Sequence, residues 1–432
     1  MMDLANFQVV VLMGGLGTRL QEYTEAEPKA MVKIQGIPFF DYQLKLMYQS
    51  GFRKFLFLLG YQGEKIQEYY KTGEKLGVTI QYCNDGKDLL GTGGAVRNAF
   101  SYLEEKFMLL YADSFMDIDY KETVYRYTRS KKRALMTIFK NNNQLDTSNV
   151  WLQDGEIILY DKQNPVKEME YIDYGIGIYE KEIFLSYAQG IKFDISEIQK
   201  KLSLDKQLEN QIVIKRFYEI GSPSSLLEFD KYAKKRYFES HPAIFLDRDG
   251  VINEIVFNDD IEQFDSPLKT EEVVIMDQVI EALKIIKRLD YYIFIVTNQP
   301  AAAKGKTSLA TLYDINKKLM SEIEESGIKI DEVYMCPHYD KENTYTKEHF
   351  LIKECTCRKP KPGLLYMAKE RYNIQWESSY MVGDSYTDIL AGKAAGLNTV
   401  LIGTLKCDMC KQLQDYRPNR IVNNLLDFAR SL

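Results

Sequence analysis

Short apolar runs alternate with helical patterns along the first half of the chain. The apolar runs lie at 7–13, 54–59, 77–82, 106–111 and 134–139. Apolar residues recur with helical spacing at 39–50, 63–71 and 94–104. A continuous apolar run is typical of a buried parallel strand, because helices cover both faces of a parallel sheet. The pattern therefore predicts an α/β domain with a mixed, mostly parallel sheet.

The second half of the chain repeats this arrangement. Its strands are predicted at 243–246 and near 291–297, 330–335, 379–383 and 398–402. Its helices are predicted near 276–289, 308–325, 363–372 and 386–395. A basic stretch at 231–237 lies between the halves, and we interpret it as a solvated helix end followed by a linker. We therefore predict two Rossmann-like α/β domains, at 1–238 and 239–432.

Composition and charge exclude several classes of protein. The 432 residues include 56 Lys and Arg and 62 Asp and Glu, a net charge of −6 that argues against a general nucleic-acid binder. No apolar run approaches the ~20 residues of a membrane span, and no basic segment precedes the first apolar run, so no signal peptide is expected. Six cysteines are too few for a disulfide framework. We expect a cytoplasmic protein that binds neither nucleic acid nor membranes, and its oligomeric state stays open.

A glycine-rich turn follows the first strand. Gly14, Gly15 and Gly17 lack a Cβ atom, so the backbone N–H groups of the turn can approach a phosphate. Thr18 adds a hydroxyl donor, and Arg19 adds a planar guanidinium suited to phosphate oxygens. Alone this turn is a weak signal, since it matches neither the Walker loop nor the dinucleotide-binding fingerprint.

The motifs downstream of the turn make the pattern specific. Gly14–Leu20 and Pro28–Met31 read Gly-Gly-x-Gly-Thr-Arg-Leu and Pro-Lys-x-Met. With them, residues 7 to 230 resemble the nucleotidyltransferases that make NDP-sugars from a sugar 1-phosphate and an NTP. Within that family the likeness is greatest to heptose 1-phosphate and mannose 1-phosphate guanylyltransferases. The resemblance also implies a base-contacting loop, made of Gly91, Thr92 and Gly93.

The same resemblance implies roles for the charged residues. The sugar phosphate attacks the α-phosphorus and pyrophosphate leaves, so cations and a divalent metal must offset the negative charge. Arg19 is then expected to hold the leaving phosphates and Lys29 to neutralise the α-phosphate. Asp113 is expected to carry Mg²⁺, with Glu219 in the place of the family's usual second aspartate. Lys162 resembles the sugar-phosphate lysine, although a solvated surface position is an equal alternative.

Asp247-Arg248-Asp249-Gly250 follows the first strand of the second half. Two carboxylates this close repel each other unless a cation lies between them. The first aspartate can act as a nucleophile and the second as general acid and base. A plain turn or a calcium loop is the alternative, but no EF-hand spacing follows and the sequence returns at once to apolar residues.

Three later motifs accompany this one, at Val296–Gln299, Arg358–Gly363 and Val382–Asp388. Together the four resemble the haloacid dehalogenase (HAD) phosphatase superfamily. The resemblance implies that Asp247 is the nucleophile and Asp249 the general acid and base. It also implies that Thr297 donates a hydrogen bond to the phosphoryl group and that Lys359 offsets its charge. It implies Mg²⁺ ligands as well: the side chains of Asp247 and Asp384 and the backbone carbonyl of Asp249. We expect Asp388 to brace its loop and not to bind metal.

Two cysteine-containing pairs bracket a polar loop. Cys336 and His338 are followed, after sixteen residues, by Cys355 and Cys357. Three thiolates and an imidazole make a closed tetrahedral shell for structural Zn²⁺, which would fasten a loop with little apolar material to bury. The pair Cys407 and Cys410 has no partner pair, and we interpret it as ordinary.

A HAD phosphatase with such a loop resembles the D-glycero-D-manno-heptose 1,7-bisphosphate 7-phosphatases and their histidinol-phosphatase relatives, over residues 243 to 405. The resemblance implies that Arg358 recognises substrate and that Asn253 and Asn298 bind substrate or phosphate. The chain departs from the heptose enzymes at 254–258 and at Ala301–Ala303. These departures affect the expected identity of the substrate more than the expected reaction.

The two halves together suggest consecutive reactions. Removing one phosphate from a sugar bisphosphate leaves a sugar 1-phosphate, which the first half could couple to a nucleotide. We therefore expect a bifunctional enzyme that makes a nucleotide-activated heptose from GTP for a surface polysaccharide. The alternatives are a phosphatase of another phosphomonoester, such as histidinol phosphate, and one half that only binds a sugar phosphate.

Overall fold

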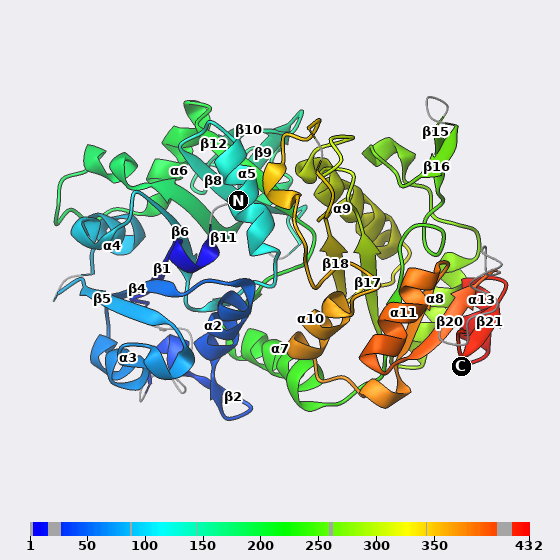
Figure 1. The fold of residues 1–432 in the computed structure, drawn as a ribbon. Coiled ribbons are helices and arrows are strands. Elements are labelled where there is room, and N and C mark those ends of the chain that lie inside the picture. The colour runs from blue at the N-terminus through cyan, green and yellow to red at the C-terminus, as the bar shows by residue number, and fades with distance from the viewer. Residues whose placement is uncertain are drawn as a thin grey trace. The chain divides into compact units, whose positions relative to one another are not determined.

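The first predicted strand lies inside a sheet. In the computed structural model, β1 (Gln8–Met13) lies between β4 (Lys54–Leu59) and β6 (Lys106–Tyr111) and is parallel to both (Figure 1). Val9 and Val11 pack into the core on one face of the sheet and Val10 into the core on the other, because successive side chains of a strand point to opposite faces. All three are completely buried. The continuous apolar run is thus a strand covered on both faces.

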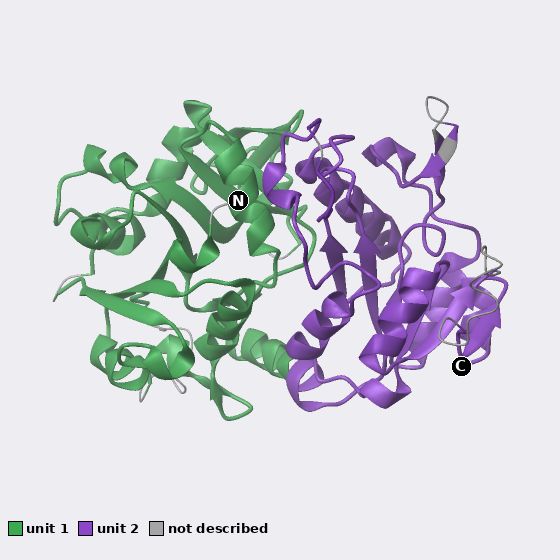
Figure 2. Cartoon of the chain, viewed as in Figure 1, with its two compact units in different colours: residues 1–233 green, residues 234–432 purple. Residues whose placement is uncertain are grey.

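The structure describes residues 3–15, 27–86, 89–144, 146–258, 262–342, 344–403 and 417–432. The chain divides into two units, residues 1–233 and 234–432, which are coloured separately in Figure 2. Unit 2 starts at Lys234, the first residue of the π-helical turn Lys234–Phe238.

The large sheet of unit 1 has nine strands within the described residues. Seven run in the order β10-β9-β11-β6-β1-β4-β5, and β8 pairs with β11 and β12. The strand β11 is antiparallel to β6 and β8, whereas β12 is parallel to β8, so the sheet is mixed. The remaining bounds are β5 (Thr79–Asn84), β8 (Ala134–Lys140), β9 (Val150–Gln153), β10 (Glu156–Tyr160), β11 (Tyr171–Glu180) and β12 (Leu208–Val213).

Helices and two short strand pairs complete unit 1. The helices are α2 (Phe39–Ser50), α3 (Gly63–Tyr70), α4 (Gly91–Asn98), α5 (Tyr120–Arg129), α6 (Ile195–Leu204) and α7 (Pro223–Ala233). The short pairs are β2 (Lys33–Ile34) with β3 (Ile37–Pro38), and β7 (Ser114–Phe115) with β13 (Tyr218–Glu219).

Unit 2 contains a six-stranded sheet in which every described pairing is parallel. Its order is β18-β17-β14-β19-β20-β21, so β14 lies between β17 and β19. The strands are β14 (Ala243–Leu246), β17 (Tyr292–Asn298), β18 (Glu332–Cys336), β19 (Tyr380–Gly383), β20 (Asn398–Ile402) and β21 (Arg420–Val422). A separate hairpin pairs β15 (Val256–Asn258) with β16 (Gln263–Asp265).

The helices of unit 2 are α8 (Val279–Arg288), α9 (Leu309–Glu325), α10 (Gly363–Arg371), α11 (Tyr386–Ala395) and α13 (Leu425–Arg430). The predicted fold class, two α/β units with mostly parallel sheets, is confirmed. None of the helices in the described ranges combines the length and the apolarity that a membrane crossing needs.

Candidate active sites

A pocket of about 300 Å³ opens at the carboxyl ends of β1, β4 and β6 in unit 1. This edge of a parallel sheet is where ligands of open α/β folds bind. The turn after β1, the segment before α4 and the end of β6 line the pocket together. Its lining includes Gly14, Gly15, Lys29, Asp85, Gly91, Thr92, Tyr111 and Asp113.

The backbone segments that carry the two predicted metal acids of unit 1 lie next to each other. Glu219 pairs with Ser114 across the strands β13 and β7, and the Ile220 N–H donates to the Asp113 carbonyl at 3.0 Å. The side chain of Glu219 turns back over Gly221, where a Cβ atom would lie 2.7 Å from its Oε1 atom. The Glu219 carboxylate therefore occupies the space that a side chain at position 221 would need.

Lys29 and Asp113 form an ion pair in the pocket. The Lys29 Nζ atom lies 2.6 Å from the Asp113 Oδ2 atom, and both residues line the cavity. Lys29 begins the short 3₁₀ helix Lys29–Met31, which follows the helix-restricting Pro28. A cation and the carboxylate that was predicted to bind metal thus line the same pocket.

Part of the predicted phosphate-binding turn can be placed. Gly14 and Gly15 line the pocket, and Gly17, Thr18 and Arg19 lie outside the described residues. Gly60, at the end of β4, approaches Gly14 so closely that a Cβ atom on it would lie 2.7 Å from the Gly14 Cα atom.

The segment that was predicted to be a base-contacting loop is not a loop, because Gly91, Thr92 and Gly93 form the start of the helix α4. The Gly93 and Gly94 N–H groups donate to the Phe193 carbonyl at 3.1 and 3.2 Å, which satisfies the helix N-terminus. Gly93 also packs on the Phe193 ring, where a Cβ atom would meet a ring carbon at 2.2 Å. Gly91 and Thr92 line the pocket, whereas Gly93 serves packing.

Three acidic residues near this site were missed by the sequence analysis. Burial raises the pKa of Asp85, which lines the pocket, to about 6. Asp173 accepts hydrogen bonds from the Gln199 side chain at 3.0 Å and from the Gly175 N–H at 2.9 Å. The charge of the exposed Lys162 acts on both Asp173 and Asp194, so the predicted sugar-phosphate lysine lies beside acids. No motif marked them, because each is an isolated acid.

In unit 2 the predicted phosphatase residues meet at one edge of the sheet. Asp247 follows β14, Thr297 lies near the end of β17 and Asp384 follows β19. Since β14 pairs with both neighbours in parallel, these three positions come together at the carboxyl ends. The Asp247 N–H donates to the Val382 carbonyl at 2.9 Å, which fixes the loop against β19.

A buried lysine lies between two carboxylates at this edge. The Lys359 Nζ atom is 2.8 Å from Asp247 and 2.6 Å from Asp388, and it donates to the Val296 carbonyl at 2.8 Å. Burial alone would lower the pKa of Lys359, but the two carboxylates raise it above its usual range. Burial raises the pKa of Asp247, an effect that Asp388 increases and Lys359 opposes.

Asp249 accepts hydrogen bonds from four side chains. Arg248 approaches both carboxylate oxygens, at 3.0 and 3.2 Å, and Asn253 donates at 2.9 Å. Ser266 and Gln299 donate at 2.8 and 2.6 Å. Burial works against ionisation, yet Arg248 and these donors hold the pKa of Asp249 below its usual range. Asn253, predicted to contact substrate, here uses its amide on Asp249 and on the Glu254 carbonyl.

The carboxylates of this site fit a hard divalent cation. Carboxylate oxygens of Asp247, Asp384 and Asp388 lie within 4.8 Å of one another. Gly250, with φ of +77°, makes room for Asp384, since a Cβ atom on it would lie 2.8 Å from the Asp384 Oδ2 atom. Asp388 also caps α11 through Ser385 and pairs with Lys359, the bracing contacts expected of it. Oxygen donors of this kind suit Mg²⁺.

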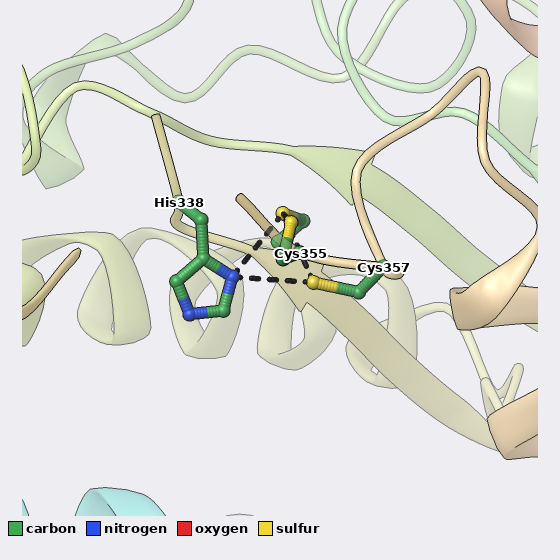
Figure 3. A group of neighbouring side chains, drawn as sticks. His338, Cys355 and Cys357 are labelled. Carbon is green, nitrogen blue, oxygen red and sulfur yellow. Dashed lines mark hydrogen bonds between the residues drawn. The ribbon is translucent and has the colours of Figure 1, made fainter. Parts of the chain in front are cut away.

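Cys336, His338, Cys355 and Cys357 form one cluster, of which three are labelled in Figure 3. The Cys336 Sγ atom lies 3.7 Å from Cys355 Sγ and 3.2 Å from Cys357 Sγ, and the His338 Nδ1 atom lies 3.2 Å from Cys357 Sγ. With Zn–S bonds of about 2.3 Å, the sulfur–sulfur edge of a tetrahedral shell is about 3.8 Å. The four donors therefore converge as a tetrahedral metal site requires.

The cluster holds the loop that leads to Lys359. Arg358 donates to the His338 carbonyl at 3.2 Å, and Gly363 fits against Thr356, where a Cβ atom would lie 2.4 Å from the carbonyl oxygen. Asn298, predicted to bind substrate or phosphate, instead pairs its amide with the backbone N–H and carbonyl of Lys359, each at 3.0 Å. Cys407 and Cys410 lie outside the described residues.

Comparison with known proteins assigns both units. A family model described as nucleotidyl transferase matches residues 8–236, and one described as HAD-hydrolase-like matches residues 356–428. The D-glycero-beta-D-manno-heptose-1,7-bisphosphate 7-phosphatase of Pasteurella multocida is 38% identical over 166 residues, which cover 38% of this chain and 83% of that protein. The D-glycero-alpha-D-manno-heptose-1,7-bisphosphate 7-phosphatase of Photorhabdus laumondii is 38% identical over 154 residues, covering 35% and 77%.

Among solved structures, HddC from Yersinia pseudotuberculosis, complexed with GMP-PN, is 24% identical and covers 52% of this chain and 99% of that chain, with a TM-score of 0.44. The two family models match separate parts of the sequence. The chain therefore belongs to the nucleotidyl transferase family and, through unit 2, to the HAD-like hydrolases that include the heptose-bisphosphate 7-phosphatases.

Proposed function

We propose that the chain is a bifunctional enzyme that converts a heptose 1,7-bisphosphate into a nucleotide-activated heptose. Unit 2 removes the 7-phosphate, and unit 1 transfers a nucleotidyl group from GTP to the remaining heptose 1-phosphate. The observation that carries the phosphatase half is the convergence of Asp247, Lys359 and Asp384 at one sheet edge. The identity of 38% with heptose-bisphosphate phosphatases supports the sugar. The two activities belong to separate domains, and we place the boundary between them in the sequence near residue 238.

The phosphatase reaction uses two aspartates in turn. This step begins with Asp249 in its protonated form. A carboxylate oxygen of Asp247 attacks the phosphorus, the bond to the sugar oxygen breaks, and that oxygen keeps the electron pair and takes the proton of Asp249. Water then attacks the aspartyl phosphate and gives a proton to Asp249, which frees phosphate and Asp247. Lys359, 2.8 Å from Asp247, offsets the charge of the incoming phosphoryl group.

Two metals complete unit 2 in this proposal. Asp247, Asp384 and the Asp249 carbonyl would hold Mg²⁺, which when bound neutralises phosphate charge. Cys336, His338, Cys355 and Cys357 would hold structural Zn²⁺, because three thiols and an imidazole converge on one point and could form a closed four-ligand shell. Zinc-binding cysteines must be reduced, so the proposed site fits the cytoplasmic location that we propose.

Nucleotidyl transfer in unit 1 follows from its charges. An oxygen of the sugar phosphate attacks the α-phosphorus of the NTP, and the bond to the β-phosphate oxygen breaks, so pyrophosphate leaves with the electron pair. Lys29, which lines the pocket with Asp113, would neutralise the α-phosphate, and Asp113 with Glu219 would hold Mg²⁺. GTP is proposed from the likeness to guanylyltransferases, and the product would supply heptose to a surface polysaccharide.

The test follows phosphate and pyrophosphate separately on the full chain. With heptose 1,7-bisphosphate and GTP, both products are expected. Asp247→Asn, which is isosteric, should abolish phosphate release and leave pyrophosphate formation from supplied heptose 1-phosphate intact. Asp113→Ala should have the opposite effect. A panel of histidinol phosphate, other sugar bisphosphates and all four NTPs identifies any other substrate, and absence of turnover on the heptose substrates overturns the proposal.

A further inference from the structure

Gln299 is the last residue of the motif Val296–Gln299 and directly follows β17. Its side chain is completely buried, and its backbone N–H donates to the Cys336 carbonyl at 2.8 Å. The Nε2 atom lies 2.6 Å from the Asp249 Oδ2 atom and 2.8 Å from the Thr297 Oγ1 atom. One amide group therefore contacts two of the residues that handle the phosphoryl group.

The chemistry of the partners fixes the direction of both hydrogen bonds. An ionised carboxylate only accepts, so the atom beside Asp249 must be the NH₂ group of Gln299. The same NH₂ group then donates its second hydrogen to Thr297. Because the Thr297 oxygen accepts this bond, its own O–H is directed to another acceptor, as a phosphoryl oxygen would be.

The other contacts of Asp249 do not have this double effect. Ser266 donates to Asp249 at 2.8 Å, and Arg248 donates to Asp249 and to Asn316. Neither bonds to Thr297 in the described structure. Ser266 therefore offers a matched variant that removes one donor from Asp249 alone.

Resting on the phosphatase function proposed above, we propose that Gln299 is a positioning residue that holds the acid/base Asp249 and directs the Thr297 hydroxyl toward the phosphoryl group. Loss of the NH₂ group should then impair both proton transfers of Asp249. The first donates a proton to the leaving sugar oxygen, and the second takes a proton from the attacking water. The attack of Asp247 on phosphorus should be affected less.

Two substrates separate these steps. The leaving nitrophenolate of p-nitrophenyl phosphate needs no proton, whereas the leaving oxygen of a sugar phosphate does. For Gln299→Met, kcat/KM on the sugar bisphosphate should fall by about 10²-fold or more, the usual range of acid–base catalysis, and on p-nitrophenyl phosphate by about 10-fold or less. Because water attack is slowed, mixing with p-nitrophenyl phosphate should give a burst of about one nitrophenolate per chain before the steady state.

The controls give each outcome a meaning. Ser266→Ala should show a smaller loss that is still selective for the sugar substrate, with KM unchanged. Gln299→Glu keeps the volume, but a carboxyl group cannot donate to both partners, so it should show the same selectivity if the Met variant does not fold. Nucleotidyl transfer reports that the chain is intact. Equal losses on both substrates without a burst would overturn the role of Gln299, whereas a wild-type chain inactive on every ester would overturn the phosphatase function itself.

Discussion

Lys359 brings a positive charge to a position that is 3% exposed. Such a charge is tolerated because Asp247 and Asp388 lie within 2.8 Å and a backbone carbonyl takes a further N–H. The same contacts keep two buried carboxylates from repelling each other. At the scale of single residues, the lysine is therefore part of the fold as much as of the reaction.

Lys359→Met should lower the free energy of unfolding by about 3–5 kcal/mol, because it leaves buried carboxylates unpaired. Urea denaturation of the full chain measures the change. Adding Asp388→Asn should recover part of the loss, since it removes one of those charges. Lys361→Met is the matched control. The Lys361 ammonium makes an exposed hydrogen bond to the Cys355 carbonyl, so this substitution should change the free energy of unfolding little. An unaltered stability in Lys359→Met would contradict the ion-pair account.

Asp85 should make unit 1 less stable as the pH rises. Its pKa is raised to about 6 by burial, so between about pH 4 and 6 the folded chain holds a proton that the unfolded chain has lost. Stability falls with pH wherever the folded state binds more protons. Asp85→Asn should therefore gain in Tm relative to the wild type through this window and keep a constant gain above it. Paired melting curves from pH 4 to 8 measure the difference, and a constant difference at every pH would be the contrary result.

At the scale of elements, apolar runs were the dependable signal. The strands at 54–59 and 106–111 have the predicted bounds, because both are continuous apolar runs in a covered sheet. The strand Leu208–Val213 was missed, since it contains the buried polar residues Asn210 and Gln211. Motifs identified the ends of β14, β17 and β19, whereas Ser266 reaches Asp249 only through folding, which no sequence spacing reveals.

The helix α4 illustrates an element determined by packing. The resemblance implied a loop at Gly91, Thr92 and Gly93, and glycine is a poor helix former. These residues nevertheless start a helix, in which the Phe193 ring occupies the space that a Cβ atom on Gly93 would need. Gly93→Ala should destabilise unit 1 by about 1–3 kcal/mol through overpacking. Phe193→Leu in the same chain should relieve most of this. Thermal denaturation of the two single variants and of the double variant measures these effects. If the losses of stability in the single variants simply add up in the double variant, the steric cause is refuted.

At the scale of the whole molecule, each unit has its own core and its own site. The large sheets belong to one unit each, and the Cys/His cluster is built entirely from unit 2. A perturbation of the cluster should therefore reach the phosphatase through Arg358 and Lys359 and leave unit 1 unchanged.

Cys355→Ser should lose about one Zn²⁺ per chain and lower phosphatase turnover, while nucleotidyl transfer stays near the wild-type rate. Cys83→Ser is the matched control, because Cys83 lies in β5 of unit 1 and is not one of the four clustered residues. Elemental analysis of protein purified without chelator, with both activity assays, measures the outcome. Full retention of zinc by Cys355→Ser, or no zinc in the wild type, would contradict the metal assignment.

The presence of both units on one polypeptide also fixes their stoichiometry. Every synthesised or degraded copy of the phosphatase is accompanied by one copy of the nucleotidyltransferase, so changes in expression cannot alter their ratio. With the proposed consecutive reactions, the steady level of heptose 1-phosphate depends only on the rate constants of the two sites and on their substrates. The ratio of the two rate constants therefore sets how much intermediate builds up. A substitution that slows unit 1 alone would cause heptose 1-phosphate to accumulate at any level of expression.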